Sequence, residues 1–187
     1  MDQSPEKRMV FISSFTALMV LGVFIRIPIG PVPVVMTNLF ILLSGYLLGP
    51  GAGAAAVGLY LFLGAAGLPV FSAGGGAALF LGPTGGYLAG YLPAAVLTGF
   101  LARCNTNRLF FLDLFFFALG AVVIYVPGVA LFKLHTGLPW DGALKAGVFP
   151  FLPGDALKVV AAAGIIRGLW RSIPEFFPVF YSGPDGS

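Results

Sequence analysis

Charged residues are scarce in this chain of 187 residues. Only 9% of the residues are Asp, Glu, Lys or Arg, whereas 58% are hydrophobic and the mean hydropathy is +0.98. A soluble domain carries about 25% charged residues, so this chain has too little polar surface to cover a water-exposed globule. The net charge of +3 comes without any basic stripe, which excludes a typical nucleic-acid partner. The composition predicts an all-α, polytopic protein embedded in the lipid bilayer.

Cysteine and histidine are almost absent as well. The chain has one cysteine, Cys104, and one histidine, His135. A single thiol excludes an internal disulfide and a cysteine metal cluster, and a lone histidine without neighbouring carboxylates indicates no metal site. No nucleophile and base occur in a catalytic motif. We therefore expect a protein that is not an enzyme and that needs no cofactor.

Long apolar runs are what the chain has in abundance. Six of them approach the ~20 residues that cross a bilayer core, at residues 9–25, 34–48, 51–66, 85–102, 109–132 and 153–170. Residues 49–51, Gly-Pro-Gly, predict a tight helical hairpin between the second and third spans. Pro93 and Pro127 predict kinks in the fourth and fifth spans. We expect one membrane-embedded domain over residues 1–187.

The distribution of Lys and Arg predicts the orientation of these spans. With the N-terminus in the cytoplasm, inner segments hold six of the ten basic residues and outer segments hold three. Both termini are therefore expected to be cytoplasmic. Three segments of unusual composition then share the outer face, where an imported solute arrives: the proline-rich turn 26–33, the glycine-rich segment 68–84 and the connector 133–152.

Small residues recur at every fourth position around the fourth span. The stripe consists of Gly82, Gly86, Gly90, Ala94, Thr98 and Ala102. In a bilayer such a stripe lets helix backbones approach closely. The glycines before it favour irregular backbone over a cavity, which membranes tolerate only where the backbone is buried in protein or faces water. Together these features predict a small, enclosed ligand site.

Asp155 and Lys158 are a charged pair inside the last predicted span. Pro153 and Gly154 indicate a helix start just before them, and a spacing of three places both side chains on one helical face. Ionisable groups within a membrane are costly and by default mark a functional site; the alternative is an ion pair that only orients the helix. Asp113, in the first turn of the fifth span, is expected to be a snorkelling carboxylate that the helix dipole stabilises.

Several short motifs occur in a fixed order along the chain. They are Ile-Pro-Ile-Gly-Pro-Val-Pro at 27–33, Leu-Leu-Ser-Gly at 42–45, Leu-Gly-Pro at 48–50, Gly-Leu-Pro-Val-Phe at 67–71, Gly-Pro-Thr-Gly-Gly-Tyr at 82–87 and Gly-Asp-x-x-Lys at 154–158. The last two are specific in combination, although each is weak alone. On these motifs most of the chain resembles the BioY family. Its members are the biotin-specific substrate-binding subunits (S components) of energy-coupling-factor (ECF) vitamin transporters.

Two places depart from the family pattern. Where that pattern has Gln and then Thr at the start of the second span, this chain has Thr37 and Asn38. The Ala-x-x-x-Ala groove that S components commonly carry on the first helix is Ser13-x-x-x-Ala17 here. Polar side chains are kept at the first place, and small side chains are kept at the second.

The resemblance implies high-affinity biotin binding from outside, with no ATPase activity in this chain. Its implied partners are a transmembrane scaffold subunit, docked at Ser13 and Ala17, and two ABC-type ATPase subunits, in the plasma membrane of a prokaryote. The implied substrate-binding residues are Asp155, Lys158, Thr37, Asn38, Phe71, Gly75, Thr84, Tyr87 and Arg26.

Biotin offers two kinds of polar group to such a site. Asp155, with Thr37 or Asn38, suits the ureido N–H groups. Lys158 or Arg26 suits the carboxylate. Which residue holds which end of biotin stays open. Two other functions also stay open, an S component for another small vitamin and a structural membrane subunit.

Overall fold

The protein is a helical bundle, described by a computed structural model over residues 5–27, 34–105 and 109–172. The α-helices of this part are α1 (Pro5–Phe24), α2 (Thr37–Ala65), α3 (Gly85–Cys104), α4 (Phe110–Thr136), α5 (Trp140–Gly147) and α6 (Leu152–Ser172). A 3-10 helix, η1 (Ala77–Leu81), lies in the glycine-rich segment, and two short strands, β1 (Arg26–Ile27) and β2 (Val34–Val35), pair antiparallel. The predicted all-α class is confirmed. The strand pair and α5 were not predicted.

α2 consists of two helices joined at Gly49. This glycine has φ 79° and ψ 173°, outside the helical region, and Pro50 follows it. A Cβ atom added to Gly53 would lie 2.7 Å from the Cα atom of Gly45, whereas residues eight apart in a straight helix are separated by about 12 Å. The chain therefore reverses at residues 49–51, as predicted. The six predicted spans correspond to α1, the two halves of α2, α3, α4 and α6.

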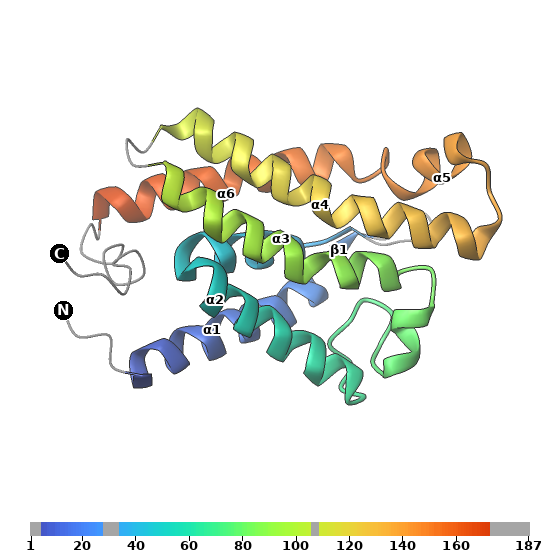
Figure 1. Ribbon diagram of the computed structural model, residues 1–187, viewed down its shortest axis with the longest axis horizontal. Helices are drawn as coiled ribbons and strands as arrows, with labels where there is room; N and C mark the ends of the chain where they lie inside the picture. Colours follow the sequence, from blue (N-terminus) through green and yellow to red (C-terminus); the bar gives the residue numbers. More distant parts are fainter. Residues whose placement is uncertain (1–4, 28–33, 106–108, 173–187) are drawn as a thin grey trace.

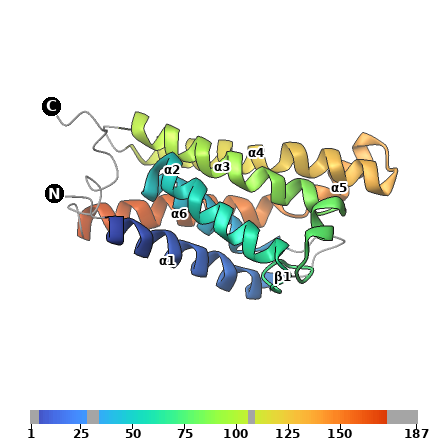
Figure 2. The ribbon, with the colours of Figure 1, turned by 60° about the horizontal axis from the view of Figure 1, so that its bottom comes forward.

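The bundle has two different ends (Figures 1 and 2). At one end α1 begins, α6 ends, and α3 gives way to α4. At the other end lie η1 and α5, and the β1–β2 pair lies toward it. We call these the terminal end and the loop end. The described parts of the three segments with unusual composition thus lie toward the loop end; residues 28–33 of the proline-rich turn are outside the described part.

The helices have the lengths and surfaces expected for a bilayer. By length and composition α1, α3 and α4 can each cross a membrane, and α2 reaches this length only as its two halves together, since it reverses at Gly49. α5 and α6 meet the same test as a pair, bent by 52°. Of the most apolar stretch of 18 residues in α4, only 33% is buried inside the protein. Phe111, for example, is 82% exposed. An apolar outer surface of this kind is what a helix that faces lipid presents.

Close packing of α3 on α4 depends on the small-residue stripe. A Cβ atom on Gly86 would lie 2.1 Å from the carbonyl oxygen of Pro127, and one on Gly90 would lie 2.8 Å from the Cα atom of Ile124. Only glycine allows this approach, as the sequence pattern predicts. α3 continues as one helix through Pro93, and α4 continues as one helix through Pro127.

Asp113 differs from the prediction. Its side chain is buried, 4% exposed, and accepts hydrogen bonds from the hydroxyl of Tyr46 and from Nδ2 of Asn105, the latter at 2.7 Å. The Asn105 side chain also bonds the backbone of Leu109 twice: its Nδ2 donates to the carbonyl oxygen of Leu109, and its Oδ1 accepts from the Leu109 N–H. A buried carboxylate requires such partners, so Asp113 fastens the start of α4 to α2 instead of reaching toward water.

Candidate functional site

A cavity lies between the helices in the half of the bundle nearer the loop end. α2, α3, α4 and α6 line it, together with β2 and the loops at residues 71–73 and 151. Its aromatic side chains are Phe71, Tyr87, Tyr91, Tyr125 and Phe151. Its charged and amide side chains are Asp155, Lys158 and Asn38. Apolar walls with a few polar groups are typical of small-ligand sites.

Asp155 and Lys158 form the charged part of the cavity. Both lie in the first two turns of α6, and their spacing of three brings the Lys158 Nζ atom 2.7 Å from Oδ1 of Asp155. They are 7% and 5% exposed. Removing such a charge pair from water is costly, and further hydrogen bonds are needed to offset that cost.

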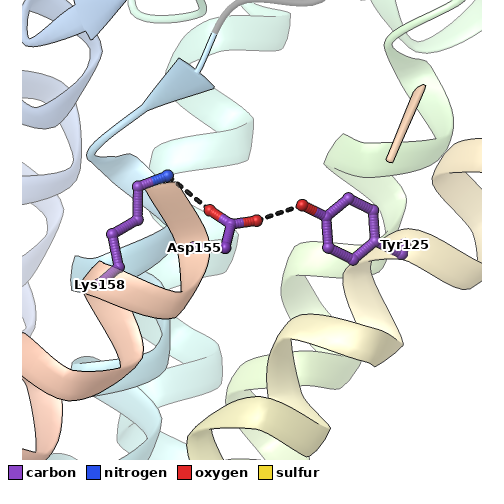
Figure 3. Close-up of polar contacts among 3 residues, drawn as sticks. All are labelled: Tyr125, Asp155 and Lys158. Atoms are coloured by element: carbon purple, nitrogen blue, oxygen red, sulfur yellow. Dashed lines mark hydrogen bonds and ion pairs between the residues drawn. The ribbon is translucent and has the colours of Figure 1, made fainter. Parts of the chain in front are cut away.

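Tyr125 of α4 supplies one of these further hydrogen bonds. Its hydroxyl donates to Oδ2 of Asp155, so the carboxylate lies between a lysine of its own helix and a tyrosine of the neighbouring one (Figure 3). Each carboxylate oxygen thus has one donor from the protein. A carboxylate has roughly four acceptor positions, so it still has lone pairs to offer a ligand.

The aromatic wall joins the cavity to α5. The rings of Tyr87 and Tyr125 meet edge to face, with centroids 6.3 Å apart and planes at 83°. The Tyr87 hydroxyl donates to the carbonyl oxygen of Gly147, the last residue of α5, at 2.7 Å. On the other side Phe71 packs edge to face on Tyr60 with centroids 5.5 Å apart. These contacts fix the orientations of the rings, as a preorganised site requires.

Thr37 and Asn38 occupy different environments although they are neighbours. The Thr37 hydroxyl donates to the carbonyl oxygen of Met19 at 3.1 Å, and Thr37 is not among the cavity-lining residues. It joins α2 to α1. Asn38 lines the cavity, and its Oδ1 atom is buried without a hydrogen-bond partner in the described part of the chain.

The other predicted site residues also fall into two groups, those that line the cavity and those that do not. Phe71, Thr84 and Tyr87 line the cavity with Asp155 and Lys158.

Gly75 is exposed and does not line the cavity. The backbone of Arg26 lies in β1, and its side chain is outside the described part of the structure.

Sequence reasoning missed Tyr91 and Tyr125. Tyr91 follows Tyr87 by four residues, a spacing that places both rings on one face of α3, so the sequence contained a signal for it. Tyr125 carried no such signal, because an aromatic residue inside an apolar span is ordinary and its partner Asp155 is 30 residues away.

The predicted docking residues lie away from the cavity. Ser13 and Ala17 are both exposed on α1 and are separated by one helical turn. In the described part of the chain, no group of three or more His, Cys, Asp or Glu side chains is placed to hold a metal ion.

Comparison with known proteins gives consistent matches along the chain. The model of the BioY family matches residues 1–175. The biotin transporter BioY of Thermotoga maritima is 41% identical over 150 residues, which cover 80% of this chain and 87% of that protein. The biotin transporter BioY of Rhodobacter capsulatus is 39% identical over 183 residues, which cover 91% of this chain and 96% of that protein.

A solved structure has the same fold. It is the crystal structure, at 2.1 Å, of the S component for biotin from an ECF-type ABC transporter. The TM-score is 0.85 at 32% sequence identity, and the match covers 95% of this chain and 98% of the other. Sequence and fold thus agree over nearly the full length.

Proposed function

The chain belongs to the BioY family, and from that premise we propose that it is the biotin-binding S component of an ECF-type vitamin transporter. Relatives named as biotin transporters, and a solved S component for biotin with the same fold, support this function. The chain is a transporter subunit and not an enzyme.

The observation that carries the proposal is the buried Asp155–Lys158 pair within an aromatic cavity. Biotin has a compact, mostly apolar bicycle, a ureido group with two N–H donors and one carbonyl acceptor, and an anionic tail. The tyrosines and phenylalanines suit the bicycle. Asp155 accepts from N–H groups, and Lys158 donates to a carbonyl or carboxylate oxygen. Without a ligand these groups form fewer hydrogen bonds than they can, whereas a urea-like ligand supplies the missing donors and acceptor.

The loop end faces the exterior in this proposal, and both termini face the cytoplasm. The excess of Lys and Arg in the inner segments supports this orientation. The cavity then lies in the outer half of a single membrane-embedded domain, and biotin reaches it past the glycine-rich segment. The membrane is the plasma membrane of a prokaryote.

Uptake requires partners, because S components carry no ATPase activity. We assign a transmembrane scaffold subunit and two ABC-type ATPase subunits to this role. Ser13 and Ala17 give α1 a face with small, exposed side chains, and such faces allow close helix approach in a bilayer. The scaffold subunit docks there.

Thermal unfolding of the purified subunit tests the binding function. Protein in detergent, freed of ligand, is heated with and without saturating biotin, and with thiamine and riboflavin in parallel. A ligand that binds only the folded state raises the midpoint of thermal unfolding. Of the three vitamins, only biotin should raise it. Stabilisation by another vitamin and not by biotin would assign the subunit to that vitamin. Folded protein that responds to none of them would favour a structural role.

A further inference from the structure

A charged recess lies at the terminal end of the bundle, far from the cavity between the helices. It is formed where α4 begins and α6 ends, and its volume is about 160 Å³. Its lining residues are Asp113, Arg167, Trp170 and Arg171, none of which lines the cavity. We call it the terminal recess. Two guanidinium groups and one carboxylate give it a formal net charge of +1, which matches a ligand with a single negative charge.

The two arginines of the terminal recess lie beside aromatic rings and not beside counter-charges. The Cζ atom of Arg167 lies 5.9 Å from the centroid of the Phe110 ring on α4, within the range of a cation–π contact. Arg171 follows Arg167 by four residues, so both side chains lie on one face of α6. Among residues 5–27, 34–105 and 109–172, neither arginine forms an ion pair. Both guanidinium groups can therefore bind an anion.

Asp113 restricts which anion the terminal recess accepts. This carboxylate is 4% exposed, and its hydrogen bonds from Tyr46 and Asn105 both reach Oδ1. A carboxylate has roughly four acceptor positions, so Asp113 can accept a further bond from a hydroxyl group in the recess. Its negative charge repels a dianion. The recess therefore favours a monoanion that also carries hydroxyl groups.

Apolar side chains continue from the terminal recess along the membrane-facing surface. Phe111, next to Phe110 on α4, is 82% exposed. Val160 is 52% exposed and lies two turns before Arg167 on the same face of α6. Trp170 is of the residue type that lies at the level of lipid headgroups. Basic pockets between transmembrane helices bind anionic headgroups, and the apolar surface beside this one provides a place for acyl chains.

We propose that the terminal recess binds one anionic phospholipid of the phosphatidylglycerol type. The lipid phosphate lies between Arg167 and Arg171, and the hydroxyl groups of the glycerol headgroup donate to Asp113. The acyl chains follow the exposed surface between α4 and α6. In the proposed orientation the lipid belongs to the cytoplasmic leaflet. The site shares no residue with the cavity, so it does not depend on the proposed biotin binding.

Lipid titration of the purified protein tests this site. Delipidated protein in detergent is titrated with phosphatidylglycerol or phosphatidylethanolamine, and native mass spectrometry measures the affinity for the first bound lipid. Thermal unfolding with each lipid, and with inorganic phosphate, gives a second measurement. The proteins are the wild type, the double variant Arg167→Gln/Arg171→Gln, and Arg103→Gln as the matched control. Arg103 is also exposed at the terminal end, with its Cζ atom 5.9 Å from the Phe100 ring, but it does not line the recess.

The wild type should bind the first phosphatidylglycerol about tenfold or more tightly than phosphatidylethanolamine, whose headgroup has no net charge. Phosphatidylglycerol should also raise the midpoint of thermal unfolding, because it binds the folded state. The double variant should lose most of this preference, since each basic side chain near an anionic lipid contributes about fivefold to binding. Arg103→Gln should keep both the affinity and the preference.

Four outcomes would overturn the proposal. The first two are equal binding of both lipids by the wild type and a full preference kept by the double variant. The third is an equal loss in Arg103→Gln, which would assign the effect to the general basic charge of the terminal end. The fourth is stabilisation by inorganic phosphate as strong as that by phosphatidylglycerol, which would assign the recess to a soluble anion. If the double variant does not fold, the single variants Arg167→Gln and Arg171→Gln decide in its place.

Discussion

The hydroxyl of Tyr125 on α4 donates a hydrogen bond to Oδ2 of Asp155 on α6. Because Lys158 holds the other carboxylate oxygen, the carboxylate is fixed from two helices at once (Figure 3). Asp155 therefore presents its remaining lone pairs in a defined direction. Preorganisation of this kind lowers the entropic cost of binding.

Tyr125→Phe should weaken biotin binding about three- to tenfold, the value of one hydrogen bond. The ring and its packing on Tyr87 stay, but the Asp155 carboxylate loses one support. Calorimetry on Tyr125→Phe, Asp155→Asn and the double variant should give effects that do not add, because the two side chains are in contact. Tyr46→Phe is the control. It removes the hydroxyl that bonds Asp113 and should lower the thermal midpoint without changing affinity. Additive effects would mean that Tyr125 does not act on binding through Asp155.

Asp155→Asn and Lys158→Ala should each weaken biotin binding by more than tenfold, or about 1.4 kcal/mol. Each change removes a side chain that we propose to contact biotin and leaves the other group buried without its counter-charge. Asp141→Asn and Lys145→Ala give a matched control, because that pair is 3.8 Å apart and both side chains are 70% exposed. If the Asp155 and Lys158 variants fold and bind biotin normally, the pair only orients α6.

Gly86→Ala should destabilise the bundle by about 1–3 kcal/mol, the cost of overpacking. The new Cβ atom would lie 2.1 Å from a backbone oxygen of Pro127, so α3 and α4 would have to separate. Gly164→Ala on α6 has no atom within 4 Å of the new Cβ and should leave the stability equal or slightly higher. Denaturation in detergent, followed by circular dichroism, measures both. Equal stability of the two variants would mean that α4 moves aside freely.

Ala17→Trp should abolish biotin uptake and copurification with the scaffold and ATPase subunits, while the isolated subunit binds biotin normally. A large side chain prevents close helix approach at a small-residue face. Ala118→Trp on the exposed side of α4 provides the control for bulk in the membrane. An intact complex with Ala17→Trp would move the docking face to the second half of α2, where a Cβ atom on Gly58 meets no atom within 4 Å.

The fold was predictable because its strongest determinants are local. Six long apolar runs and the Gly-Pro-Gly break define the helices and the hairpin without reference to any other part of the chain. α5 escaped prediction since its eight residues are too few and too polar for a span. The β1–β2 pair is only two residues per strand, below what sequence alternation can indicate.

The site was predictable where its residues cluster in sequence and not where they meet only in space. Asp155 and Lys158 are three residues apart, so their pairing followed from helix geometry. Tyr125 and Asp113 depend on partners 30 and 67 residues distant. Contacts between residues so far apart cannot be read from the sequence. For this reason Tyr125 is not among the predicted site residues, and Asp113 was expected to be a snorkelling carboxylate. Asn38 and Thr37 were equivalent in the sequence, and only the direction of each side chain separates them.

The reversal of α2 at Gly49 leaves its first half too short to cross a bilayer. The twelve residues from Thr37 to Leu48 make about 18 Å of helix at 1.5 Å per residue, whereas the hydrocarbon core is ~30 Å thick. In the proposed orientation the reversal faces the cytoplasm, so a half-helix of this length starts below the outer surface of the membrane. The cavity beside its first turn would then lie at membrane depth, and a solute from outside would enter the bilayer region on binding.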